Sequence, residues 1–334
     1  MGQGAYILGC QATRLIPAEK AFFAEADPWG FILFARNIAD PDQLRALTDE
    51  LRAAVGRAAP ILIDQEGGRV ERMRGPHWRQ WMPAADHVKL AGSNAERSMW
   101  LRYRLIGDEL RRVGIDCNCA PVADIARRRT HPILANRCYG AGAVKVTSIA
   151  RSVADGLMAA GVLPVIKHMP GHGRAFADSH LDLPVVETSE KELLQTDFVP
   201  FAALNDLPMA MTAHIVYSEM DGAAATVSSR MIDVMRGDIG FGGLLMSDDI
   251  SMQALAGSLE ERVGAAMAAG CDLVTHCTGD LDEMRAVTGV GGAMTSAAQA
   301  RADAALETRR QVQEMDIAAL EAEQRDLLGG SPYV

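Results

Sequence analysis

The chain has few aromatic residues and no excess of positive charge. Phe, Trp and Tyr make up 5% of its 334 residues, and 43 acidic side chains outnumber 33 basic ones, which gives a net charge of −10. Proteins that bind nucleic acid usually carry a basic stripe, often with aromatic side chains that stack on bases. The composition therefore argues against nucleic acid as a partner.

Long apolar runs are also missing. No stretch approaches the roughly 18 apolar residues that a membrane-spanning helix needs, and no basic segment precedes the short apolar run at residues 6–10, as a signal peptide would require. The six cysteines form no C-x-x-C pair and lie mostly inside apolar runs. Buried thiols in a reducing compartment fit this pattern better than a disulfide framework or a zinc site. We predict a cytoplasmic protein with no membrane contact.

Eight short apolar runs alternate with longer amphipathic segments. The runs cover residues 5–10, 31–36, 61–64, 117–124, 162–168, 209–214, 243–248 and 272–276. The amphipathic segments, with apolar residues three and four positions apart, cover residues 41–55, 95–113, 146–160, 189–204, 229–236 and 259–269. Apolar strands that alternate with helices are typical of a parallel sheet covered on both faces.

Eight such strands favour an α/β fold closed into a single (β/α)8 barrel of the TIM type. An open, doubly wound sheet is the alternative, but no G-x-G-x-x-G motif follows the first strand. Residues 1–334 are predicted to form one catalytic barrel domain. The tail at about 297–328 alternates Ala and Leu with Glu and Arg at helical spacing. This spacing predicts one or two helices packed on the outside of the barrel.

Polar residues end most of the apolar runs. They are Asp64, Asp124, Lys167, His168, His214, Asp248, Asp249 and His276. The C-terminal ends of barrel strands meet at one mouth, and a buried charge costs several kcal/mol unless it is paired or used. We therefore expect a polar functional site at that mouth.

The segment after the fifth run is rich in histidine, glycine and proline, and two kinds of site fit it. His168, His172 and His214 with an aspartate resemble the ligands of a metal-dependent barrel amidohydrolase, although the first strand has no H-x-H pair and the glycines favour a loop-shaping role for His172. Alternatively, His168 and its neighbours hold an oxygen-rich ligand while a nearby Asp178–His180 pair transfers protons. Both readings stay open on these residues alone.

The seventh run delivers Asp248 to the same mouth. A carboxylate at this place suits a nucleophile that attacks an anomeric carbon and forms a glycosyl ester. Its neighbour Asp249 suits the N-cap of a following helix.

Taken together, these motifs closely resemble the family 3 glycoside hydrolases. More narrowly, they resemble the bacterial single-domain β-N-acetylhexosaminidases of peptidoglycan recycling. The resemblance extends along nearly the whole chain and is carried by residues 30–37, 64–70, 120–124, 167–173, 178–180, 211–214 and 247–249.

The resemblance implies a retaining, two-step hydrolysis that removes terminal N-acetylglucosamine (GlcNAc) from peptidoglycan-derived muropeptides such as GlcNAc-anhydroMurNAc. Asp248 would be the nucleophile and would form a covalent glycosyl-aspartate intermediate. His180, oriented by Asp178, would act as general acid and then as base, which departs from the usual pair of carboxylates. A histidine suits this work because its ordinary pKa lies near neutrality.

The resemblance also implies a sugar-binding set of Asp64, Arg137, Lys167 and His168, with Met252 as an apolar wall. A carboxylate accepts hydrogen bonds from hydroxyl groups, and cations donate to hydroxyl or acetamido oxygens. No cofactor and no metal is expected. The expected partner is a small carbohydrate, and the protein itself is expected to be a monomer or a homodimer.

Two related activities stay open, a family 3 β-glucosidase or β-xylosidase and an N-acetylglucosaminide phosphorylase. A histidine acid is compatible with phosphate as acceptor, so the residues do not separate hydrolysis from phosphorolysis. The three consecutive arginines at 127–129 suggest the further hypothesis that the aglycone side favours anionic muropeptides.

Overall fold

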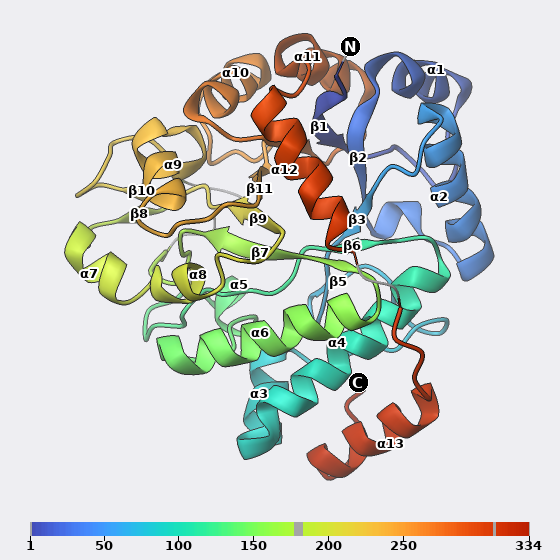
Figure 1. Cartoon of the computed structure of the whole chain (residues 1–334), viewed down its shortest axis with the longest axis vertical. Coiled ribbons are helices and arrows are strands. Elements are labelled where there is room, and N and C mark those ends of the chain that lie inside the picture. Colours follow the sequence, from blue (N-terminus) through green and yellow to red (C-terminus); the bar gives the residue numbers. More distant parts are fainter. Residues whose placement is uncertain (1, 177–182, 310–311, 334) are drawn as a thin grey trace.

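Eight parallel strands form a closed barrel in this computed structural model, which describes residues 2–176, 183–309 and 312–333 (Figure 1). Their order around the barrel is β1-β12-β11-β9-β7-β6-β3-β2. The barrel strands are β1 (Gly4–Leu8), β2 (Pro28–Leu33), β3 (Ile61–Ile63), β6 (Cys117–Asn118), β7 (Leu163–Met169), β9 (Met209–Thr212), β11 (Leu244–Asp249) and β12 (Leu273–His276). The predicted (β/α)8 barrel is confirmed, and each predicted apolar run overlaps one barrel strand.

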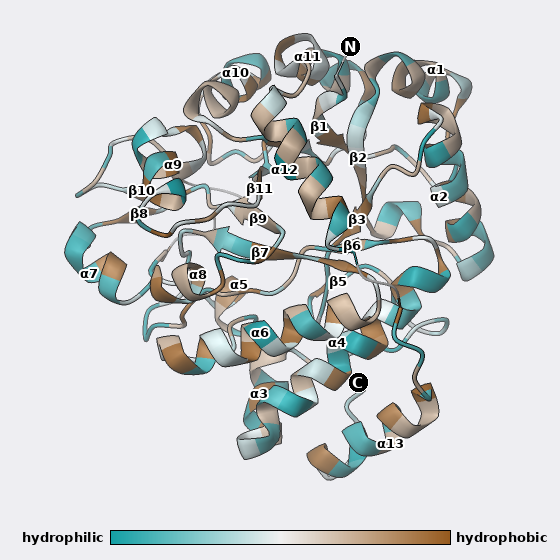
Figure 2. Cartoon of the chain, in the orientation of Figure 1, coloured by the Kyte–Doolittle hydropathy of each residue, from teal (hydrophilic) through white to brown (hydrophobic). Residues whose placement is uncertain are grey.

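Helices surround the barrel, and their two-sided hydropathy is visible along α4 and α6 in Figure 2. The helices are α1 (Pro17–Ala26), α2 (Pro41–Val55), α3 (Ala84–Ala91), α4 (Ala95–Arg112), α5 (Pro132–Ala135), α6 (Ala143–Ala159), α7 (Glu190–Gln195), α8 (Val199–Ala203), α9 (Ser229–Arg236), α10 (Leu259–Ala269), α11 (Leu281–Gly291), α12 (Ser296–Glu307) and α13 (Ile317–Leu328). The remaining elements are three 3-10 turns, η1 (Ala35–Asn37), η2 (Gly92–Asn94) and η3 (Ala225–Val227), and two small ribbons, β4 (Gln65–Gly67) with β5 (Val70–Glu71) and β8 (Val185–Val186) with β10 (Val216–Tyr217). None of the described helices is long and apolar enough to span a membrane.

The predicted helix at 189–204 is divided into α7 and α8. Thr196 and Asp197 leave the helical path between them, and the Thr196 hydroxyl donates to the Asp197 carboxylate over 2.7 Å. Pro200, in the first turn of α8, has no N–H to continue a helix from α7. Apolar residues of the pattern are buried in both helices, but the pattern does not show where α7 ends and α8 begins.

The strand predicted at 31–36 begins and ends three residues earlier, as β2. The residues after it turn into η1, where the Asn37 side chain accepts a hydrogen bond from the Phe34 N–H over 3.0 Å. An asparagine that bonds to nearby backbone in this way favours a turn over an extended strand.

The C-terminal helices occupy two different places. α13 packs on the outside, against α3 and α4. α12, however, lies across the N-terminal end of the barrel, where Ala298, Ala302 and Ala305 are buried in the same apolar cluster as the barrel interior. The small alanine face lets the helix approach the strand ends closely, so this part of the tail closes the barrel. That the chain is one domain stays a prediction.

Asp272, at the start of β12, fastens α12 to the barrel. Its carboxylate is 2% exposed, accepts the Leu245 N–H over 2.9 Å, and pairs with Arg236 over 2.7 Å and with Arg301 of α12. Asp272→Asn is therefore expected to lower the free energy of unfolding by about 3 kcal/mol, because it breaks a buried ion pair. Urea denaturation measures the change. Asp282→Asn, which breaks an exposed pair on α11, is the control, and an equal loss in both variants would contradict this account.

Candidate active site

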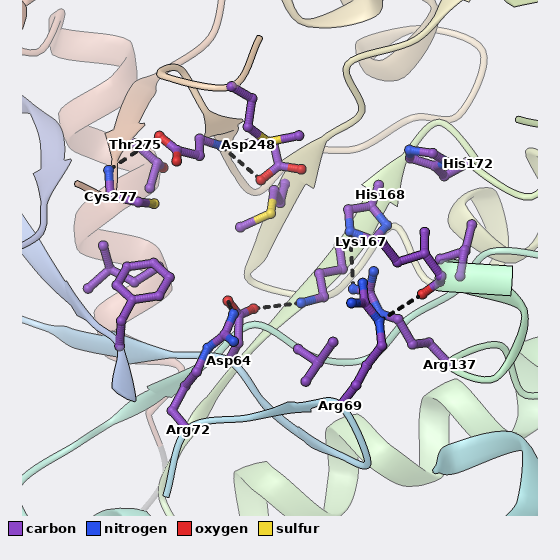
Figure 3. A pocket seen from close by; sticks show the side chains of 18 residues that line it. Asp64, Arg69, Arg72, Arg137, Lys167, His168, His172, Asp248, Thr275 and Cys277 are labelled. Atoms are coloured by element: carbon purple, nitrogen blue, oxygen red, sulfur yellow. Dashed lines mark hydrogen bonds and ion pairs between the residues drawn. The ribbon is translucent and has the colours of Figure 1, made fainter. Parts of the chain in front are cut away.

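A cavity of about 280 Å³ opens at the C-terminal ends of the barrel strands (Figure 3). Pockets for small molecules usually begin at about 300 Å³, so this one suits a small ligand. Its charged or titratable lining residues are Asp64, Arg69, Arg72, Arg137, Lys167, His168, His172, Asp248, Asp249 and Cys277, and its apolar ones include Ile32, Phe34, Met211 and Met252.

Asp64 is held between two cations on one side of the cavity. It follows β3, and its Oδ1 accepts from Lys167 Nζ over 2.7 Å while its Oδ2 accepts from Arg72 Nη2 over 3.0 Å. Burial raises the pKa of Asp64, but Lys167 and Arg72 lower it more strongly, so the net pKa is well below the ordinary value. Asp64 is therefore an ionised acceptor for ligand hydroxyl groups.

Glu66 continues this chain of charges behind the cavity. Its Oε1 lies 2.7 Å from Lys167 Nζ, and its two oxygens accept a bidentate pair of hydrogen bonds from Arg137, over 2.9 Å from Nε and 2.8 Å from Nη2. Burial raises the pKa of Glu66, and Arg137 and Lys167 bring it down to about 2. The same carboxylates raise the pKa of Lys167 against the opposite effect of burial, so Lys167 stays charged.

Asp124, fully buried after β6, fixes His168, one of the histidines that line the cavity. Its Oδ2 lies 2.7 Å from His168 Nδ1, and its Oδ1 accepts the His172 backbone N–H over 2.6 Å. Burial raises the pKa of Asp124, but the two histidines lower it further, so Asp124 accepts hydrogen bonds and His168 Nδ1 carries the proton. His168 Nε2 then faces Arg137 Nη2 at 3.4 Å as an acceptor, which agrees with Arg137 being able only to donate.

Asp248, at the end of β11, presents its carboxylate to the cavity from across these groups (Figure 3). Its Oδ1 accepts the backbone N–H of Asp249 over 2.8 Å. Burial raises its pKa, whereas electrostatic interactions with His214, His168 and Lys167 and the hydrogen bond from the Asp249 N–H lower it, and the net pKa is below the ordinary value. Asp248 is therefore ionised at neutral pH, as a nucleophile must be.

Asp249 has a structural role that differs from the predicted helix cap. Its carboxylate accepts from the Ser251 N–H and hydroxyl and from the Cys277 N–H, within 2.8–3.3 Å. The next helix, α10, starts ten residues later and is capped by Ser258. The backbone carbonyl of Asp249 accepts from His214 Nε2 over 3.0 Å, so these bonds fix the turn that follows the Asp248 carboxylate.

The structure brings most of the predicted site residues together. Asp64, Arg137, Lys167, His168, Met252 and Asp248 all line the cavity. Asp178 and His180 lie outside the described residues. Within the described part of the chain, Asp124, His214 and His276 do not reach the cavity: the first two brace groups beside it, and His276 bonds to Glu283.

Three charged residues in or behind the cavity are not among the predicted site residues: Glu66, Arg69 and Arg72. All three lie just beyond β3, in or beside the small β4–β5 ribbon, whereas the apolar run itself ends at Asp64. The only signal in the sequence is the density of charged residues from Asp64 to Arg72, and the fold of the ribbon is needed to show which of them turn inward.

Two of the three arginines at 127–129 make contacts away from the cavity. Arg127 pairs with the buried Asp197 over 2.8 Å, together with Arg174, and the Arg129 guanidinium lies 4.2 Å from the Phe176 ring centre. These contacts fasten the loop at residues 173–176 to its neighbours. The preference for anionic aglycones stays a hypothesis.

Groups suited to hold a metal ion are not found among residues 2–176, 183–309 and 312–333, where no cluster of three or more His, Cys, Asp or Glu side chains has the required arrangement. The Nδ1 atoms of His168 and His214 already have other partners: that of His168 bonds to Asp124 and that of His214 bonds to Thr226. The six cysteines are all free thiols.

Glu66 also gives a prediction for acid unfolding. Its pKa falls from 4.5 to about 2 on folding, so the ionised form stabilises the fold above pH 4.5 and this contribution is lost as the pH falls towards 2. Glu66→Gln is therefore expected to lose stability less steeply than the wild type below pH 4.5. Denaturant titrations at neutral pH and at several acidic pH values measure the slopes, and parallel slopes would contradict the shift.

The chain is similar in sequence and in structure to known proteins of one family. Residues 15–311 match the glycosyl hydrolase family 3 N-terminal domain. A β-hexosaminidase of Alkalilimnicola ehrlichii is 39% identical over 82% of this chain and 80% of its own, and one of Pseudomonas aeruginosa is 35% identical over 82% of each. The crystal structure of NagZ from Neisseria gonorrhoeae, in complex with N-trifluoroacetyl-D-glucosamine, superimposes with a TM-score of 0.88 at 28% identity, covering 98% of this chain and 99% of that one. The chain belongs to glycosyl hydrolase family 3.

Proposed function

We propose that this protein is a retaining exo-β-N-acetylglucosaminidase that removes terminal GlcNAc from peptidoglycan-derived muropeptides such as GlcNAc-anhydroMurNAc. The observation that carries the proposal is the pairing of an ionised carboxylate, Asp248, with a cavity whose polar groups are already held in place. Preorganised donors and acceptors of this kind supply much of the rate enhancement of enzymes.

The cavity offers the donors and acceptors that a pyranose requires. Asp64 accepts from neighbouring hydroxyl groups, and Arg137 and Lys167 donate to hydroxyl or acetamido oxygens. A sugar hydroxyl replaces the long 3.4 Å contact with Arg137 as the donor to His168 Nε2. Met252, 9% exposed, supplies apolar surface for the acetyl methyl group. The related NagZ that binds N-trifluoroacetyl-D-glucosamine and the relatives named β-hexosaminidase support GlcNAc as the sugar.

The reaction proceeds in two displacements. An Asp248 oxygen attacks the anomeric carbon, the glycosidic bond breaks, and the departing oxygen takes a proton from His180. Water then attacks the glycosyl ester, gives its proton to His180, and the Asp248 carboxylate is released. Asp178 orients His180. The roles of both residues rest on the sequence motif at 178–180.

We place the reaction in the cytoplasm, in the recycling of cell-wall fragments. Six free thiols, five of them buried, suit a reducing compartment. The relatives named β-hexosaminidase support the substrate class, and the narrow cavity suits a terminal sugar better than an internal one.

Turnover of matched 4-nitrophenyl β-glycosides tests the proposal. The N-acetylglucosaminide is expected to react at least about 100-fold faster, in kcat/KM, than the glucoside or xyloside, because the latter leave the acetamido-binding groups unpaired. The rate is expected to be the same with and without a chelator. Equal rates for the glucoside would sink the proposal in favour of a β-glucosidase.

Repeating the assay in phosphate and in a non-phosphate buffer separates hydrolysis from phosphorolysis. We expect GlcNAc as the product in both buffers. GlcNAc 1-phosphate as the main product in phosphate would make the protein a phosphorylase.

A further inference from the structure

We propose that Glu66 is a positioning residue that sets the directions in which Arg137 and Lys167 present their remaining N–H groups to the sugar. The inference rests on the proposed function for the identity of the ligand. The structural claim is independent of the proposed function: a buried carboxylate behind the cavity directs two cations into it.

Glu66 joins two cations that come from distant parts of the chain. Lys167 lies in β7 and Arg137 follows α5, and their side chains meet at the Glu66 carboxylate over distances of 2.7–2.9 Å. With Asp64 and Arg72 on one side and His168 and Asp124 on the other, Glu66 completes an unbroken chain of ion pairs and hydrogen bonds below the cavity. Glu66 joins the two halves of this series of ion pairs and hydrogen bonds.

Glu66 is buried too deeply to act by touching the substrate. Its side chain is 2% exposed. The described residues that line the cavity include Arg137 and Lys167 but not Glu66. Any effect of Glu66 on the reaction must therefore pass through these two cations.

The hydrogen bonds made by Glu66 decide which donors are left for a ligand. Arg137 gives Nε and Nη2 to Glu66, and its Nη1 makes no hydrogen bond within the described part of the chain. The Lys167 ammonium has three donors, of which one goes to Asp64 and one to Glu66, so one is left. The bidentate pair also fixes the plane of the guanidinium, and hence the direction of Nη1.

The backbone under Glu66 is itself held firmly. The fully buried Arg102 donates from Nη2 to the Glu66 carbonyl, and the Tyr103 hydroxyl lies 3.4 Å from the same oxygen. The next residue, Gly67, has φ +101°, and a Cβ there would lie 2.0 Å from Arg102 Nη2. Only glycine fits this close approach. The carboxylate is thus attached to a rigid support.

The substitution Glu66→Gln keeps the shape and replaces an acceptor pair with an amide. One end of the amide can only donate, so the second bond of the bidentate pair with Arg137 is lost, and the negative charge that holds both cations is lost with it. Both cations are then free to turn towards Asp64 or Asp248. A misplacement of about 1 Å in a substrate-positioning group can cost about 100-fold in rate.

A matched variant separates positioning from a general loss of stability. Asp272, at the opposite end of the barrel, is also a buried carboxylate paired with two cations, Arg236 and Arg301. Asp272→Asn removes the same kind of charge without touching the cavity. Both variants are expected to lower the midpoint of thermal unfolding, and only Glu66→Gln is expected to change the kinetics.

The test measures steady-state kinetics on 4-nitrophenyl N-acetyl-β-glucosaminide and the Kd of GlcNAc by calorimetry, for the full chain. Glu66→Gln is expected to lower kcat/KM about 100-fold, with KM and the Kd of GlcNAc raised about tenfold. Asp272→Asn is expected to match the wild type. Glu66→Asp keeps the charge but is one methylene shorter, and it is expected to restore part of the loss. If Glu66→Gln does not fold, Glu66→Asp decides the question.

KM and Kd within twofold of the wild type in a folded Glu66 variant, or equal kinetic losses in Asp272→Asn, would overturn the proposal. A wild-type protein that neither hydrolyses the N-acetylglucosaminide nor binds GlcNAc would instead refute the proposed function. In that case crystal structures of the wild type and Glu66→Gln decide the positioning claim without any ligand. An unmoved Arg137 guanidinium would refute it, and a displaced one would support it.

Discussion

Replacing Asp248 with asparagine is expected to lower kcat on 4-nitrophenyl N-acetyl-β-glucosaminide by about 10⁴-fold or more, the scale of loss seen when a nucleophile is removed. The amide is a poor nucleophile and cannot form the glycosyl ester. The structure gives the wild-type carboxylate what the reaction needs, because His214, His168 and the Asp249 N–H outweigh burial and keep the pKa of Asp248 low. Steady-state rates of the purified variant, compared with those of the wild type, measure the loss.

Binding provides the control for this variant. Asparagine has nearly the shape of aspartate, and the sugar-binding chain from Asp64 to His168 does not include Asp248 among its hydrogen-bond partners. The Kd of GlcNAc is therefore expected to change by less than about tenfold. A variant that keeps more than a tenth of wild-type kcat while binding normally would exclude Asp248 as the nucleophile.

Replacing His180 with alanine is expected to have the second largest effect, a loss of about 10²–10⁴-fold in kcat/KM for substrates with poorly acidic leaving groups. A 4-nitrophenyl leaving group needs little protonation, so the loss of kcat/KM for it is expected to be much smaller. The fall of activity above the pKa of the histidine acid, ordinarily about 6.5, is expected to disappear. Rates for a series of aryl N-acetylglucosaminides across a range of pH measure both changes.

Azide offers a second test of the same variant. The anion needs no general base, so it is expected to restore turnover of the 4-nitrophenyl substrate and to release the β-configured glycosyl azide. Equal losses for good and poor leaving groups, or an unchanged basic limb of the pH profile, would assign the acid to another residue.

The barrel could be predicted because its strands are short apolar runs that end at polar residues. Three helices, α2, α9 and α10, also have the predicted bounds, since caps mark their starts: Asp40 binds the Gln43 N–H, Ser228 the Met231 N–H and Ser258 the Glu261 N–H. Periodicity and capping are local properties, and a single sequence records both of them.

The features that could not be predicted depend on contacts between distant residues. The break at Thr196 and Asp197 is held by Arg127 and Arg174, which approach from other loops. The position of α12 depends on how its alanine face fits the end of a barrel that first has to close. In the same way, the link made by Glu66 between Arg137 and Lys167 becomes visible only when β4 is placed beside β7, and no spacing along the chain encodes it.

The most direct test of the account is to trap the glycosyl-enzyme intermediate. Incubation with a fluorinated, activated N-acetylglucosaminide slows the second displacement, and digestion followed by mass spectrometry locates the adduct. We expect a single sugar ester, on the peptide that contains Asp248, and no such adduct in Asp248→Asn. An adduct on another residue, or none in an enzyme that turns over the unmodified substrate, would contradict it.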